Sequence, residues 1–138
     1  MIVLDTNVVS MLMERKVDAR ALAWLDRQLP DTLWTTSITV MEVRFGLELK
    51  PAGRRRGELE AAFVRVLNED FEGRILSLDK AAAEFAGDIS ARHRLAGHPI
   101  EIRDAQIAGI AMACGARLAT RNIRHFGNTG IELINPWE

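Results

Sequence analysis

The regular alternation of short apolar segments with longer amphipathic ones constrains this chain more than any other feature. The short segments have the length and composition of strands, and each pair is separated by at least one helical pattern. The expected strands cover residues 1–4, 32–36, 73–78, 116–120 and 130–136. Strands buried on both faces and alternating with helices are typical of a parallel sheet covered by helices on its two sides. We therefore predict an α/β fold with a mainly parallel, about five-stranded sheet.

Helical periodicity and capping residues locate the helices between these strands. The expected helices cover residues 5–13, 19–29, 38–49, 58–70, 79–97 and 101–115. Asp18 and Asp79 are suitable N-cap residues, and Gly115 is a suitable C-terminal stop. Spacing on the helices points Leu29 and Ile102 toward the core. Residues 50–57 are expected to form a loop that enters the fourth helix.

Length, charge and cysteine content exclude several classes of protein. The 138 residues are enough for one core, so we expect a single domain over residues 1–138. A net charge of −1 argues against binding nucleic acid through overall charge alone. The single cysteine, Cys114, excludes an internal disulfide and is expected to be a small buried residue. No apolar run approaches the roughly 20 residues of a membrane span, and we expect a cytoplasmic location.

Acidic residues recur at the expected carboxyl ends of strands. Asp5 directly follows the first strand, and Glu42 lies near the start of the helix after the second. Asp104 lies near the start of the helix that precedes the fourth strand, and Thr120 to Asn122 follow that strand. Functional residues of open parallel sheets gather at this edge, so we expect these side chains to converge.

Each acid also has a purely structural explanation. Asp5 is a suitable cap for the following helix, Thr39 to Glu42 fit the capping box S/T-x-x-E, and Asp104 suits the dipole of a helix start. Three acids at one sheet edge, however, repel one another and raise one another's pKa. A divalent cation with oxygen ligands, such as Mg²⁺, relieves that conflict and suits phosphodiester hydrolysis. No zinc-type His/Cys spacing and no phosphate-binding glycine loop is present.

Four motifs in register carry a resemblance to a known family. "MIVLDTNVVS", "TTSITVMEVRFGL", "RDAQIAGIA" with "GARLATRNIRHF", and the terminal "INPW" resemble PIN-domain proteins of the VapC/FitB type over essentially the whole chain. The resemblance implies a three-layer α/β/α PIN fold and a Mg²⁺- or Mn²⁺-dependent ribonuclease that is the toxin of a type II toxin–antitoxin pair. It also implies a homodimer, a larger assembly with a cognate antitoxin, an RNA substrate, and DNA binding only through the antitoxin.

The same resemblance assigns roles to individual residues. Asp5, Glu42 and Asp104 are the expected catalytic, metal-binding acids, and the supporting residues are Thr6, Asn7, Thr120 and Asn122. Many family members have a fourth acid where this chain has Asn122. An asparagine brings no charge, which favours one firmly held metal; it is also a suitable N-cap for residues 123–126.

The remaining candidates are basic residues. Arg121 and Arg124 are expected to contact RNA phosphates, and His125 is expected to have a structural or RNA-contacting role rather than that of a base. For Arg54 to Arg56, a solvated helix start and a contact to RNA or an acidic partner remain equally open. Trp137 is expected to be a packing residue rather than one that stacks on a base. The alternative function is a catalytically weakened PIN-like binding module that acts mainly through an antitoxin complex on DNA; Asn122 favours it and the three intact acids oppose it.

Overall fold

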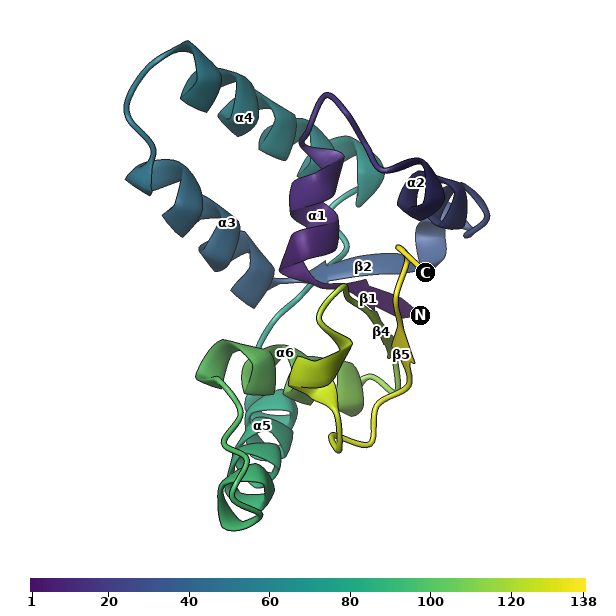
Figure 1. Ribbon diagram of the computed structural model, residues 1–138, viewed down its shortest axis with the longest axis vertical. Helices are drawn as coiled ribbons and strands as arrows, with labels where there is room; N and C mark the ends of the chain where they lie inside the picture. Colours follow the sequence, from purple (N-terminus) through teal and green to yellow (C-terminus); the bar gives the residue numbers. More distant parts are fainter.

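The computed structural model describes residues 1–138 and contains one sheet of five parallel strands in the order β3-β2-β1-β4-β5 (Figure 1). The strands are β1 (Ile2–Leu4), β2 (Leu33–Thr36), β3 (Ile75–Leu76), β4 (Arg117–Ala119) and β5 (Leu133–Ile134). The predicted α/β fold with a parallel five-stranded sheet is confirmed. The third and fifth strands are shorter than the expected ranges.

Helices cover both faces of this sheet (Figure 1). They are α1 (Thr6–Leu12), α2 (Ala19–Asp26), α3 (Ser37–Leu49), α4 (Arg54–Arg65), α5 (Lys80–Leu95) and α6 (Ile102–Ala113). Short helical turns lie at η1 (Pro30–Thr32), η2 (Val66–Asp70) and η3 (Ile123–Phe126). No helix combines the length and the apolar composition needed to cross a bilayer.

The core is divided into two layers by the alternation of side chains along β1. Ile2 and Leu4 point into the layer that contains the buried residues of α1, α3 and α4, whereas Val3 points into the layer formed with α5 and α6. Successive side chains of a strand face opposite sides, so one apolar strand serves both layers. β1 is the central strand, and the residue that follows it is therefore held between two packed layers.

Close packing of α5 on α6 depends on Gly109. A Cβ atom added at this position would lie 2.8 Å from the backbone nitrogen of Ala86 and 2.9 Å from its Cβ. These distances are shorter than real Cβ atoms show. The two helices can approach this closely only because residue 109 is glycine. This packing holds α6, which carries Asp104, against the sheet.

Several sequence expectations about helix limits and burial are wrong. α4 begins at Arg54 rather than at residue 58, because ion pairs one turn apart, such as Arg54–Glu58, stabilise its first turn. Leu29 is 70% exposed because α2 ends at Asp26, and Ile102 is exposed because it is the first residue of α6. Cys114 is exposed as well, at the C-terminal cap of α6.

Candidate active site

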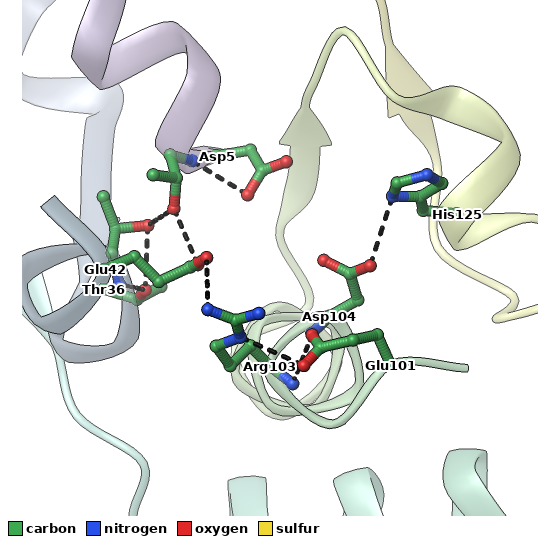
Figure 2. Close-up of polar contacts among 9 residues, drawn as sticks. Asp5, Thr36, Glu42, Glu101, Arg103, Asp104 and His125 are labelled. Carbon is green, nitrogen blue, oxygen red and sulfur yellow. Dashed lines mark hydrogen bonds and ion pairs between the residues drawn. The ribbon is translucent and has the colours of Figure 1, made fainter. Parts of the chain in front are cut away.

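The predicted acids lie at the carboxyl edge of the sheet. Asp5 follows β1 directly and caps α1, Glu42 lies in α3, and Asp104 lies in the first turn of α6. Figure 2 shows the three carboxyl groups facing a common space from three different elements. The charge of Asp5 raises the pKa of both other acids. The expected convergence at one sheet edge is therefore found.

Asp5 is the most enclosed of the three acids, with 5% of its surface exposed. Its Oδ1 accepts a hydrogen bond from the backbone N–H of Thr6 at 2.8 Å, and its Oδ2 accepts one from the hydroxyl of Thr120 at 2.7 Å. Burial raises the pKa of Asp5, and the hydrogen bonds from Thr120 and Thr6 only partly offset this rise. Asp5 therefore has both expected roles: Oδ1 caps α1, and Oδ2 bonds to Thr120 in the site.

Asp104 has the most strongly shifted pKa of the site. Burial, followed by the negative charge of Asp5, raises its pKa from 3.8 to about 6. Nδ1 of His125 lies 3.3 Å from Oδ2 of Asp104, and a positive charge on this ring lowers the pKa of Asp104. The pair Asp5 and Asp104 therefore carries more negative charge than its surroundings compensate.

Glu42 is held by Thr6 and Arg103 rather than by its own helix start. Its Oε1 accepts a hydrogen bond from the hydroxyl of Thr6 at 2.9 Å, and Oε2 lies 3.7 Å from Nη1 of Arg103. Burial raises the pKa of Glu42, while the contacts with Thr6 and Arg103 lower it. The capping-box explanation is wrong, because the N-cap of α3 is Thr36 and not Thr39.

Threonine hydroxyls and an asparagine connect the strands behind these acids. The hydroxyls of Thr6 and Thr39 are 3.0 Å apart, and the hydroxyl of Thr36 caps the N–H of Thr39 at 3.1 Å. On the other side, Oδ1 of Asn7 accepts a hydrogen bond from the backbone N–H of Arg121 at 3.2 Å. Thr6, Asn7 and Thr120 therefore position the site without themselves carrying charge.

Two contributors were missed by sequence reasoning. Thr39 is identified in retrospect by the T-x-x-T spacing from Thr36, which is a helix-start signal. Arg103 bridges Glu42 and Glu101, the N-cap of α6, with its Nε 3.0 Å from the Glu101 carboxylate. No sequence signal pairs Arg103 with Glu42, because the two residues come from separate helices.

Asn122 and the basic candidates line the outside of the site. Asn122 occupies the N-cap position of η3, but its side chain makes no capping hydrogen bond, so that expectation is wrong. Its backbone N–H donates to the hydroxyl of Thr120 at 3.0 Å, and its carbonyl accepts a hydrogen bond from the N–H of His125 at 3.0 Å. Arg121, Arg124 and His125 are exposed. Neither of the two arginines forms an ion pair, in contrast to most arginines of the chain.

The run Arg54 to Arg56 is neutralised within the chain. Arg54 pairs with Glu58, Arg55 with Glu14 at 2.7 Å, and Arg56 with Glu48 and Glu60 at 2.7 Å each. Their positive charge is balanced by neighbouring carboxylates, which favours the structural explanation of this run over a contact with RNA.

The donor set of the site fits a hard divalent cation. The acids do not form a cluster of three or more side chains close enough to hold a metal, and each contacts its own neighbours. All candidate donors are nonetheless oxygens, and burial leaves Asp5 and Asp104 with raised pKa values that a cation would lower. A groove of about 700 Å³ opens beside Asp104 and is also lined by Arg124 and His125.

Comparison with known proteins gives consistent results. The PIN domain family model matches residues 2–131. The chain is 41% identical to the VapC ribonuclease Y4jK of Sinorhizobium fredii over 138 residues, which cover 100% of this chain and 99% of the relative.

Solved structures of two complexes resemble the whole chain. FitAcB from Neisseria gonorrhoeae aligns with a TM-score of 0.90 at 31% identity, covering 100% of this chain and 99% of that one. DNA-bound VapBC from Salmonella typhimurium aligns with a TM-score of 0.79 at 28% identity, covering 98% and 97%.

Proposed function

The chain belongs to the PIN-domain family, and from this membership we propose that it is the toxin of a VapC/FitB-type toxin–antitoxin pair and acts as a divalent-metal-dependent endoribonuclease. The observation that carries the proposal is the buried Asp5 and the partly buried Asp104, two carboxylates from separate elements that face each other at the sheet edge. Glu42 completes an all-oxygen donor set. The relative Y4jK carries the name of a VapC ribonuclease, which supports the nuclease assignment.

We assign the metal to Asp5, Asp104 and Glu42, with Mg²⁺ as the preferred ion and Mn²⁺ as a substitute. When bound, such an ion polarises a phosphate and makes bound water a better nucleophile. The chain's own residues position these donors: Thr120 and the N–H of Thr6 fix the rotamer of Asp5, and the hydroxyl of Thr6 orients Glu42. The contact between Glu42 and Arg103 spans 3.7 Å at a partly exposed position, so it costs little to break.

The substrate side of the site consists of exposed cations. Arg124 and His125 line the groove beside Asp104, and Arg124 has no carboxylate partner to neutralise it. An arginine in this position binds a phosphate through paired N–H donors. We therefore assign to Arg124 and His125 contacts with the RNA backbone next to the cleaved bond.

The partners proposed for this chain follow from the complexes to which it is similar. FitAcB and VapBC are the names of toxin–antitoxin complexes, and the VapBC structure includes DNA. We propose that this single PIN domain forms a homodimer, is held in a larger assembly by a cognate antitoxin, and reaches DNA only through that antitoxin. The neutralised run Arg54 to Arg56 agrees with a chain that has no DNA-binding surface of its own.

One observation favours the second candidate, a weakened PIN-like module. The side chain of Asn122 is exposed, uncharged and makes no hydrogen bond, although many family members have an acid there. A gain of activity in Asn122→Asp would show that this position limits catalysis, whereas an inactive wild type rescued by the same change would identify the chain as a module that has lost its chemistry.

The test is cleavage of a mixed single-stranded RNA pool by purified chain free of antitoxin, with Mg²⁺, Mn²⁺ or EDTA. Asp5→Asn and Asp104→Asn are expected to abolish metal-dependent cleavage while the far-ultraviolet circular dichroism remains that of the wild type. Asp31→Asn, an exposed carboxylate on η1 without a hydrogen bond or ion pair, is the matched control and should cleave normally. Folded wild type that cleaves no RNA with either metal would refute the ribonuclease proposal.

A further inference from the structure

Arg121 and Trp137 form a stacked pair beside the site. The guanidinium carbon of Arg121 lies 5.1 Å from the centre of the Trp137 ring. Trp137 is partly buried and packs against the core layer that contains Ile2 and Leu4. Arg121 is exposed and forms no ion pair. The pair therefore has one side fixed to the core and a planar cation on the side that faces solvent.

Hydrogen bonds hold the backbone of both members of the pair in place. The backbone N–H of Arg121 donates to Oδ1 of Asn7, two residues after Asp5, and the backbone N–H of Trp137 donates to Oδ1 of Asn135 at 3.0 Å. The carbonyl of Trp137 accepts a hydrogen bond from Nη1 of Arg20 at 3.3 Å. The backbone beneath the two side chains is therefore already ordered before a ligand stacks on them, which lowers the cost of binding.

A second groove adjoins this pair. It has a volume of about 380 Å³, and its lining includes Arg121, Asn122, Asn135 and Glu138. Arg124 and His125 line both this groove and the groove that contains Asp104, so η3 lies between the two. The carboxylate of Glu138 makes the second groove unfavourable for a phosphate, while the amide side chains of Asn122 and Asn135 suit the polar edge of a neutral ring.

We propose that the pair Arg121–Trp137 is a stacking platform for one unpaired nucleobase of the RNA, across η3 from the cleaved phosphodiester. Unpaired bases of RNA commonly stack on aromatic rings or on arginine guanidinium planes. Here the base lies on the guanidinium of Arg121, which Trp137 supports from below, and the amide of Asn122 contacts the base edge. The platform differs from a phosphate contact because it requires the flat guanidinium and not only its charge. This inference rests on the proposed ribonuclease function and adds a base-binding subsite to it.

The experiment uses a single-stranded oligoribonucleotide and a set of copies with one abasic nucleotide at each position in turn. Binding is measured by fluorescence anisotropy with Mg²⁺ in the cleavage-deficient Asp104→Asn background. We expect one abasic position, close to the bond that the wild type cleaves, to weaken binding by about 5- to 150-fold, the range of base stacking on protein side chains.

Adding Arg121→Lys separates stacking from charge. It should weaken binding of the intact oligonucleotide by a similar factor, remove the extra loss at that one abasic position, and leave the salt dependence of binding unchanged. Trp137→Phe, which retains an aromatic ring in the core, should produce the same pattern with a smaller loss. Arg65→Lys on α4, an exposed arginine without an ion pair, is the matched control and should change neither quantity.

The outcomes distinguish this inference from the proposed function. If Arg121→Lys weakens binding of the intact oligonucleotide and of every abasic copy by the same factor, or weakens none of them, the platform is refuted while the nuclease stays intact, provided that wild type cleaves RNA. A wild type that neither binds nor cleaves any RNA would refute both.

Discussion

Replacing Asp104 by asparagine should make the metal-free protein more stable while abolishing cleavage. Burial and the charge of Asp5 raise the pKa of Asp104 from 3.8 to about 6 in the folded chain. The folded state therefore binds a proton more tightly than the unfolded chain does. The stability that this proton contributes is fully present below about pH 3.8 and is lost as the pH rises through about 6. At neutral pH the folded protein therefore carries an unfavourable charge that asparagine removes.

The size of the effect follows from the two pKa values. At 1.36 kcal/mol per pKa unit, the difference between 3.8 and about 6 corresponds to an upper bound of about 3 kcal/mol. The side chain is 20% exposed, so solvent screening reduces this figure to about 1–2 kcal/mol. With an unfolding entropy of about 2.1 cal/mol/K per residue over 138 residues, the expected rise in Tm is about 3–7 °C.

The assay is thermal and urea unfolding of wild type and Asp104→Asn in EDTA, at a series of pH values from about 3.5 to 8. The gain in free energy of unfolding should be largest near neutral pH and should vanish toward pH 3.5. The exposed control Asp31→Asn should show no gain that depends on pH in this way. A variant that is less stable than wild type at neutral pH, or equally stabilised at every pH, would refute the claim that Asp104 carries an uncompensated charge.

Three further predictions concern the supports of the site. Thr120→Val removes the 2.7 Å hydrogen bond to Asp5 and should lower the free energy of unfolding by about 1–3 kcal/mol and shift the acidic limb of the pH–rate profile upward; an unchanged profile would contradict this. Gly109→Ala forces a methyl group against the backbone of α5 and should destabilise the fold by about 1–3 kcal/mol in urea unfolding, which a neutral effect would disprove. Arg55→Gln, whose charge is already paired, should leave the salt slope of RNA binding unchanged, whereas Arg124→Gln should reduce it by about one; equal slopes for the two variants would argue against the assignment.

The sequence was sufficient for the fold and for the position of the acids because both follow from order along the chain. Strands alternate with helices, and a residue that directly follows an inner strand must lie at the carboxyl edge of the sheet. Asp5 and Thr120 satisfy this condition on the adjacent strands β1 and β4, and they are joined by a hydrogen bond. For such residues the topology leaves little freedom.

The failures of sequence reasoning concern contacts between helices. Glu42 fits a capping box, but α3 begins at Ser37, and this places Glu42 in the second turn with its carboxylate toward Thr6. The partner of Glu42 on α6, Arg103, depends on how α3 and α6 lie across the sheet, which no local pattern determines. Trp137 was expected to be a packing residue rather than a base-stacking one, and its pairing with Arg121 likewise depends on the positions of β4 and the C-terminal segment.

In this site, different residues hold the acids in place and carry the negative charge. The hydroxyls of Thr6, Thr36, Thr39 and Thr120 are hydrogen-bonded inside the chain, and no buried polar side-chain atom lacks a partner. These neutral groups hold the carboxylates in place. The cost of the site then lies in charge alone, on Asp5 and Asp104. Asp104 accepts none of these hydroxyl hydrogen bonds, so a neutral amide at that position removes its charge without disturbing them. Loss of activity in Asp104→Asn can therefore be attributed to chemistry and not to collapse of the scaffold.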